Sequence, residues 1–132
     1  MNFHAPRLSH RLVGALAASS ILTACAGMAM SPAKVADGAL TDTAGKTLYT
    51  FDRDVAASGK SVCNGPCAGN WPAFAAPADA TTSGDYTVVT RDDGAKQWAF
   101  RGKPLYTFAK DTKAGDRIGD GFNNNVWHIA RP

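Results

Sequence analysis

From residue 38 to its end, the chain alternates short apolar runs with segments rich in Gly, Asp and Asn, a pattern typical of short β-strands joined by turns. Segment 71–85 is rich in Ala and Pro, and we predict a loop there with at most one helical turn. The fold class is therefore predicted to be mainly β, with short antiparallel strands joined in hairpins. The predicted strands are Ala39–Thr41, Lys46–Phe51, Tyr86–Thr90, Gln97–Arg101, Leu105–Phe108 and Asn124–Ala130.

One stretch of ten residues occurs twice. Residues 45–54 read GKTLYTFDRD and residues 102–111 read GKPLYTFAKD, with seven positions identical. A tryptophan follows each copy at almost the same spacing, Trp71 after the first and Trp127 after the second. Two copies of one unit can bury each other's apolar faces. We therefore predict two related antiparallel β units in one small domain over 36–132, with repeat 1 at about 38–75 and repeat 2 at about 86–132.

The first 24 residues have the pattern of a secretory signal peptide. Two arginines precede an apolar run, Leu12–Leu22, which is too short to span a membrane as a helix. The run ends in LTAC, which resembles the lipobox of bacterial lipoproteins and implies a lipid on Cys25. Residues 25–35 would then be the lipidated cysteine and a tether. Ordinary cleavage near Ala24, with Cys25 left as a thiol, is the alternative.

The three cysteines fit this interpretation. If Cys25 carries lipid, Cys63 and Cys67 remain as an even set in an oxidising compartment, and we predict a disulfide that pins their loop. The alternative is a redox role for the pair. The spacing is not the C-x-x-C of thioredoxin-like sites, and nothing nearby lowers a thiol pKa.

The motif Tyr-x-Phe-x-x-Asp, present twice, resembles that of bacterial secreted repeat lipoproteins described by Y-x-[FWY]-x-x-D. The segment GKSVCNGPCAGNWPAF and the second half from DDGAKQWAF onward are also similar to that family. The resemblance spans about residues 38–132 and implies export, a lipid anchor and repeated β units. It implies no chemistry, because the role of the family is unknown.

The repeated aromatic and acidic residues allow two interpretations. In one, the rings form the core, and the Asp side chains accept backbone N–H bonds in turns. In the other, the rings line a cleft that suits a sugar, a haem-like ring or a peptide, with the carboxylates facing it. His128 is likewise either an ordinary strand residue or a ligand or base. The candidate ligand-facing residues are Tyr49, Phe51, Asp54, Trp71, Tyr106, Phe108, Asp111, Trp127 and His128.

The net charge and the residue types present exclude several classes of function. Lys and Arg number 14 against 11 Asp and no Glu, and two arginines fall in the signal segment, so no basic nucleic-acid surface is expected. His128 is the only histidine after Cys25, so we expect no zinc site and no resident cofactor. A calcium loop at 114–125 is a weaker alternative, because no Glu is available as a bidentate ligand.

The favoured function is a non-enzymatic binding or envelope-interaction module. Its expected partners are the membrane, through the lipid anchor, and an envelope protein or a small ligand. The expected location is the cell envelope, on the outer membrane, facing the periplasm or the cell surface. The alternatives are a redox or electron-transfer accessory that uses Cys63 and Cys67 or a bound cofactor, and an envelope hydrolase that uses His128.

Overall fold

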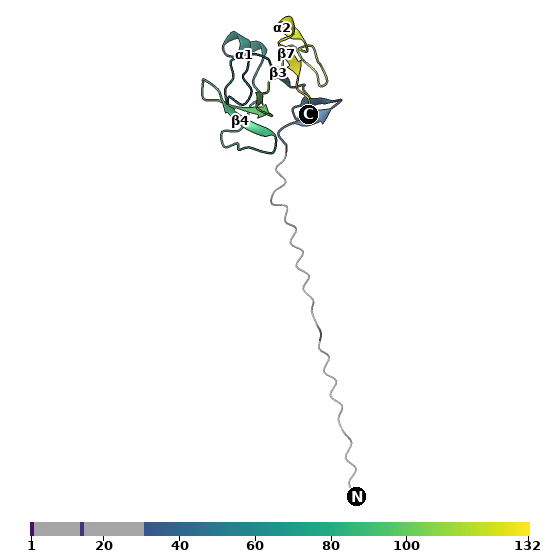
Figure 1. Ribbon diagram of the computed structural model, residues 1–132. Helices are drawn as coiled ribbons and strands as arrows, with labels where there is room; N and C mark the ends of the chain where they lie inside the picture. The colour runs from purple at the N-terminus through teal and green to yellow at the C-terminus, as the bar shows by residue number, and fades with distance from the viewer. Residues whose placement is uncertain (2–13, 15–30) are drawn as a thin grey trace.

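The computed structural model describes residues 1, 14 and 31–132, so Cys25 and all of the predicted signal segment except Met1 and Gly14 lie outside the described residues. The described strands form three small antiparallel sheets, β1–β2, β3–β7 and β4–β5–β6 (Figure 1). The predicted mainly β fold is confirmed. The elements are β1 (Lys34–Ala36), β2 (Ala39–Thr41), β3 (Tyr49–Phe51), α1 (Pro66–Asn70), β4 (Tyr86–Thr90), β5 (Lys96–Phe100), β6 (Lys103–Pro104), α2 (Phe122–Asn125) and β7 (Trp127–Ile129).

Several element boundaries differ from the sequence-based prediction. β2 and β4 lie where they were predicted, and β5 is shifted by one residue. β3 covers only the second half of the predicted strand Lys46–Phe51. The predicted strand Leu105–Phe108 does not form, because only Tyr106 within it makes β-bridges. The first described strand, β1, begins at Lys34, inside the segment expected to be tether. Segment 71–85 contains no helix and is the loop that was predicted, whereas the short helix α1 precedes it, with Pro66 in its first turn supplying a backbone already suited to a helix.

The last predicted strand, Asn124–Ala130, is shortened at its start, because its first two residues belong to a run of three asparagines that turns the chain. Asn123, Asn124 and Asn125 all have positive φ angles, of 53°, 58° and 64°. Asparagine tolerates this left-handed region better than most residues, and a strand cannot contain it. The chain therefore turns through α2 and becomes extended only at Trp127.

Each repeat begins with a hairpin, β1–β2 in the first and β4–β5 in the second. Equivalent backbone hydrogen bonds then join each hairpin to the motif that follows. Leu48 N donates to Leu40 O at 2.9 Å in repeat 1, and Leu105 N donates to Trp98 O at 2.9 Å in repeat 2. Each motif leads to a loop, a short helix and a tryptophan, so the two repeats share one architecture.

The two repeats exchange strands at the centre of the domain. β3 of repeat 1 pairs with β7 of repeat 2, and in the matching position Tyr106 of repeat 2 bridges Ala73 of repeat 1. Tyr49 and Tyr106 then bond each other, with Tyr49 N to Tyr106 O at 2.7 Å and Tyr106 N to Tyr49 O at 3.0 Å. A local pseudo-twofold axis therefore passes between these two tyrosines.

The glycine that opens each motif lies against an alanine of the other repeat. Gly45 and Gly102 have φ angles of 88° and 83°, which residues with a side chain rarely adopt. A Cβ on Gly45 would lie 2.9 Å from Ala114 Cβ, and one on Gly102 would lie 2.8 Å from Ala57 N. Both the turn and the close approach of the repeats therefore require glycine here.

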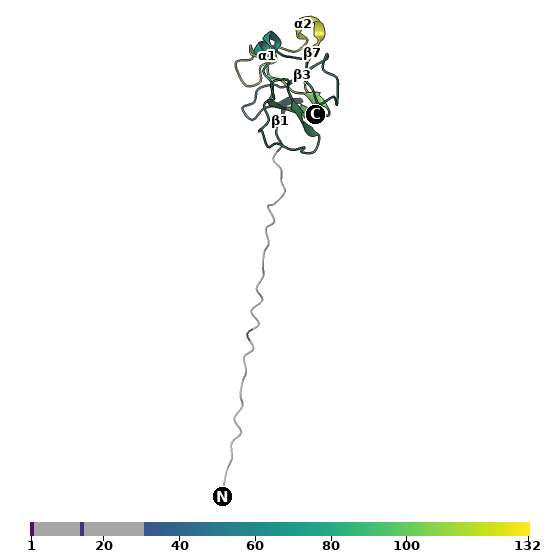
Figure 2. The same cartoon turned by 90° about the vertical axis from the view of Figure 1, so that its left-hand side faces the viewer.

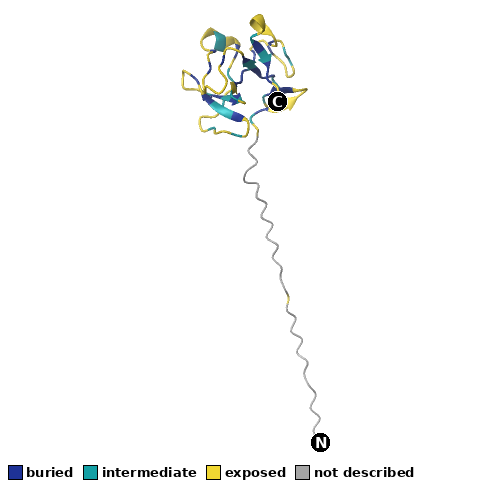
Figure 3. Ribbon diagram, in the orientation of Figure 1, coloured by how far each residue is buried: buried dark blue, intermediate teal, exposed yellow. Residues whose placement is uncertain are grey.

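Two apolar clusters fill the space between the repeats, and buried residues run through the middle of the domain while α1 and α2 are largely exposed (Figure 3). The larger cluster holds the aromatic residues of both motifs, and the second is built around three leucines, one from β2 and one from each motif. This follows from the strand period of two, which sends Tyr49 and Phe51 to one side and Leu48 to the other. The second cluster contains Ala33, Leu40, Leu48, Tyr86, Leu105 and Ala130.

Candidate functional site

The tyrosine of each motif bonds the aspartate of the other motif. Tyr49 Oη donates to Asp111 Oδ2 at 2.5 Å, and Tyr106 Oη donates to Asp54 Oδ2 at 2.5 Å. All four residues are buried. A buried carboxylate is costly unless it is hydrogen-bonded, so each repeat depends on a hydroxyl from the other.

The second oxygen of each aspartate holds the loop that follows it. Asp54 Oδ1 accepts the backbone N–H of Val62 at 2.8 Å, and Asp111 Oδ1 accepts that of Ile118 at 3.0 Å. The aspartates thus have the expected role of accepting backbone N–H bonds in loops. Their second role, as acceptors for a tyrosine of the other repeat, was not predicted.

Burial raises the pKa of both motif tyrosines well above its usual value, and the hydrogen bond from each to an aspartate raises it further. Burial also raises the pKa of the Asp54 carboxyl, while the bonds from Tyr106 and Val62 and the charge of Arg91 lower it in part. The site therefore favours neutral phenols that donate to carboxylate oxygens.

These shifts predict a loss of stability at high pH. An unfolded tyrosine loses its proton near pH 10, whereas Tyr49 and Tyr106 keep theirs in the folded protein. The contribution of the two buried phenols to the free energy of unfolding is therefore fully present below that pH. It decreases above that pH, by about 1.4 kcal/mol per tyrosine at about pH 11. Urea unfolding measured across this range should show the decrease, and variants with Phe at both positions should largely lack it. An unchanged slope in the double variant would contradict the assignment.

Four aromatic rings form one continuous stack at the pseudo-twofold axis. Trp71 and Trp127 stack on each other with ring centroids 3.8 Å apart and planes at 4°. Trp127 also stacks on Phe51 at 4.2 Å, and Trp71 on Phe108 at 4.1 Å. Each tryptophan therefore lies between the other tryptophan and a phenylalanine from the opposite repeat, so both faces of both indoles are covered.

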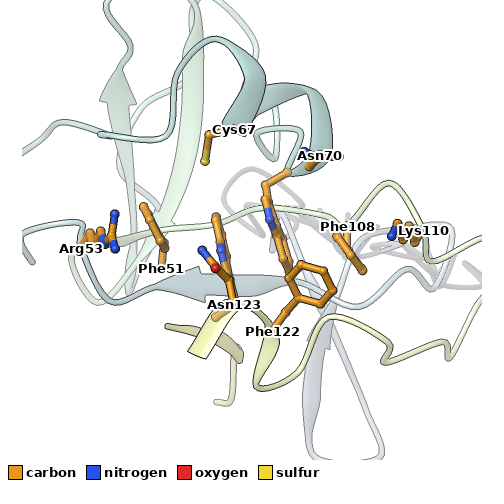
Figure 4. A pocket seen from close by; sticks show the side chains of 10 residues that line it. Phe51, Arg53, Cys67, Asn70, Phe108, Lys110, Phe122 and Asn123 are labelled. Carbon is orange, nitrogen blue, oxygen red and sulfur yellow. The ribbon is translucent and has the colours of Figure 1, made fainter. Parts of the chain in front are cut away.

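A pocket with a volume of about 410 Å³ opens along this stack. Arg53 and Phe51 lie on one side of it and Lys110 and Phe108 on the other, while Phe122 stands in front of the stack (Figure 4). Six of its lining residues form three pairs at equivalent positions of the repeats, so the pocket also lies on the axis. The pairs are Phe51 with Phe108, Arg53 with Lys110 and Trp71 with Trp127. The lining is Phe51, Arg53, Cys67, Asn70, Trp71, Phe108, Lys110, Phe122, Asn123 and Trp127.

Two segments of the chain, 31–75 and 87–131, match a protein family described as a secreted repeat of unknown function. The chain belongs to this secreted-repeat family. Its members are described as secreted, which indicates an extracellular or envelope location. No curated protein and no solved structure matches the chain. The family boundaries coincide with the two structural repeats, so the exchange of tyrosine and aspartate takes place between two family units.

The structure brings most of the predicted site residues of this secreted-repeat protein together. The aromatic candidates and the two aspartates all lie at the axis, where the rings are buried and four of them also line the pocket. The core and cleft interpretations therefore describe the same rings. His128 lies apart, half-buried on β7, with its Nε2 2.8 Å from Asp52 Oδ2.

The predicted disulfide is confirmed. Cys63 and Cys67 are bonded, with their Cα atoms 5.2 Å apart. Cys63 is buried, whereas Cys67 is partly buried and lines the pocket. The bond closes the turn before α1, which places Trp71 at the end of that helix. In repeat 2 the equivalent loop has no cysteine and instead turns through its asparagines.

Sequence reasoning missed a buried arginine that supports the site. Arg91 donates to Ser61 Oγ at 3.0 Å and to Gln97 Oε1 at 2.7 Å, and it also bonds the carbonyl of Cys63. Ser61 Oγ in turn lies 2.6 Å from Tyr106 Oη. Arg91 thus connects the β4–β5 hairpin to the disulfide loop and to one tyrosine. No motif marks it, because a single arginine after a strand usually faces solvent.

Two charged pocket residues were also missed, although the sequence carries a signal for them. Arg53 and Lys110 stand at equivalent places in the two motifs, so both copies conserve the charge. Among residues 31–132, His, Cys and Asp side chains form no group that could hold a metal ion. The chemistry that the pocket offers is therefore aromatic contact combined with positive charge.

Proposed function

We propose that this protein is a non-enzymatic binding module of the cell envelope, anchored by a lipid on Cys25, and that its ligand binds in the axial pocket. The observation that carries the proposal is the stacked pair Trp71 and Trp127, which lines a pocket formed by both repeats. Its volume is within the range of small-molecule sites. Aromatic rings combined with a few polar groups are typical of such sites.

The position of the pocket supports presentation away from a membrane. α1 and α2, which border it, lie together at one end of the domain, and β1 lies toward the other end (Figure 2). An anchor that precedes β1 would therefore leave the pocket open to the surrounding medium. No helix in the described part of the chain is long and apolar enough to cross a membrane.

Nuclear magnetic resonance tests the pocket directly. Flat aromatic compounds titrated into the folded protein should shift the amide signals of α1, α2 and the two stacked tryptophans. Replacing the exposed Asn70 with Trp narrows the pocket and should abolish those shifts. A smaller pocket of about 260 Å³ beside Arg101 and Arg131 serves as an internal control that should not respond. Shifts at that control pocket alone, or at neither site, would refute the proposal.

Lipid anchoring predicts the behaviour of a single variant. Cys25→Ser removes the thiol that would carry the lipid. The variant should therefore move from the membrane fraction to the soluble fraction, because the lipid chain is what supplies the affinity for the membrane. Cell fractionation followed by immunoblotting measures this. A variant with Ser at both Cys63 and Cys67 should stay with the membrane. If Cys25→Ser also stays there, the anchor is not at this residue.

One observation favours a redox role as a second candidate. Cys67 lines the pocket and is only partly buried, so a thiol could reach its sulfur. Thiol titration under mild reductants distinguishes the two functions, since a purely structural disulfide should resist reduction in the folded state. The hydrolase alternative has no comparable support. Ser61 bonds Tyr106 and Arg91, whereas His128 bonds Asp52, so the serine and the histidine belong to separate contacts.

A further inference from the structure

We propose that the axial pocket selects a flat aromatic anion that carries an acidic group at each of two opposite ends. This inference rests on the proposed function, because it names the chemical class of ligand for the same pocket. Two features carry it: the way in which the aromatic rings meet the pocket, and the placement of the two basic side chains.

The stack presents ring edges to a ligand. The faces of Trp71 and Trp127 are covered by each other and by Phe108 and Phe51. Tyr49 and Tyr106 also pack against these two indoles, with ring centroids 5.4 and 5.1 Å away, so only the remaining ring edges line the pocket. The edge of an aromatic ring carries the positive part of its quadrupole and therefore attracts an anion or the face of another aromatic ring. A flat aromatic body laid across these edges makes the favourable edge-to-face contact with several rings at once.

The basic side chains stand at the two ends of the stack. Arg53 lies beside Phe51 and Lys110 beside Phe108, on opposite sides of the pocket (Figure 4). Both are exposed, and neither forms a salt bridge with any of residues 31–132. Lys110 also lies 5.8 Å from the centre of the Phe122 ring. No aspartate lines the pocket. A ligand with one acidic group would pair with one end only, whereas a ligand with two would satisfy both.

Exposed Phe122 provides a further contact for a flat ligand. The residue is 40% exposed, and the centroid of its ring lies 5.9 Å from that of Trp71 and 5.1 Å from that of Phe108. A bound aromatic body would cover this ring. The pocket therefore combines an apolar contact, positive ring edges and a cation at each end. Neutral or cationic ligands should bind such a pocket more weakly than a flat anion does.

Calorimetric titration with matched probes tests the inference. The probes are a naphthalene dicarboxylate with its acidic groups at opposite ends, the corresponding monocarboxylate and the corresponding neutral diamide. We expect the dicarboxylate to bind best, the monocarboxylate about fivefold more weakly and the diamide at least about tenfold more weakly. The affinity of the dicarboxylate should decrease as salt is raised, because the two cations are exposed.

Charge-removing variants locate the effect. Arg53→Gln and Lys110→Gln should each weaken dicarboxylate binding about fivefold, and together about 25-fold, because the two ends are separate. The matched control is Arg101→Gln with Lys103→Gln, which removes the same charge from the smaller pocket on another part of the surface and should change the affinity less than about twofold. Circular dichroism of each variant checks that the fold is intact.

The outcomes separate this inference from the proposed function. If the diamide shifts the pocket amides and binds as tightly as the dicarboxylate, the ligand is not an anion, although the pocket still binds. If the variant with both Arg53→Gln and Lys110→Gln binds the dicarboxylate as tightly as the unchanged protein does, the pocket likewise does not select an anion. If no probe of any charge shifts the pocket amides, both the inference and the proposed function are wrong.

Discussion

Replacing Trp127 with alanine should lower the free energy of unfolding by about 3–5 kcal/mol. The residue is only 1% exposed, stacks on two rings and forms a T-shaped contact with Tyr106, with ring centroids 5.1 Å apart. Removing it leaves a large cavity at the axis, where both repeats supply the walls and neither can collapse without moving the other. Urea unfolding monitored by far-ultraviolet circular dichroism measures the change.

The control for this prediction is the tryptophan outside the stack. Trp98 is only partly buried and packs edge-on against Tyr86 at 6.4 Å between ring centroids, so Trp98→Ala removes a ring of the same size from a less enclosed position. Trp98→Ala should lower the free energy of unfolding by less than half as much as Trp127→Ala does. If the two variants unfold at similar urea concentrations, the stack at the axis is not the dominant part of the core.

The second large effect is a coupling between residues of different repeats. A double-mutant cycle with Tyr106→Phe and Asp54→Ala should give a coupling energy of about 1.5–3 kcal/mol, which is typical of a buried hydrogen bond to a charged group. The cycle that combines Tyr49→Phe with Asp111→Ala should give a similar value, because both phenols donate to their carboxylates at 2.5 Å.

The informative comparison is the cycle within one motif. Tyr49 and Asp54 are five positions apart in the sequence, but each bonds a partner in the other repeat, so their coupling should be close to zero. The same holds for Tyr106 and Asp111. Strong coupling within a motif and none between motifs would contradict the exchanged arrangement.

The repeat itself could be predicted from the sequence, because seven identical residues in ten are visible without structure. The alternation in LYTF also predicted which residues share a face, and Tyr49, Phe51 and Leu48 lie in the two clusters accordingly. The disulfide followed from cysteine counting. These features depend on local pattern or on composition, both of which a single sequence carries.

The exchange between repeats could not be predicted in this way. Periodicity shows that Tyr49 points inward, but it does not say whether the aspartate that it reaches is five or 62 positions away. The two motifs are nearly identical, so either pairing satisfies the same local pattern. The choice is made by the Tyr49–Tyr106 backbone bridge, which sets one strand antiparallel to the other and carries each tyrosine toward the far motif.

The predicted start of the last strand was wrong for a different reason. The last strand was predicted to begin at Asn124, whereas Asn123, Asn124 and Asn125 all have left-handed backbone angles. Three consecutive asparagines before a tryptophan were a signal for a tight turn. Arg91 could not be found at all, since its burial depends on the disulfide loop of the other repeat folding over it.

The exchanged tyrosines and aspartates also constrain how a secreted chain can mature. A chain that is exported from its N-terminus delivers Tyr49 and Asp54 first, and neither has its partner until Tyr106 and Asp111 have followed. The last strand, β7, completes the sheet with β3 only when almost the whole polypeptide has crossed. We therefore expect the first repeat to lack these stabilising contacts until the second has also been exported, and the whole domain to fold cooperatively only then.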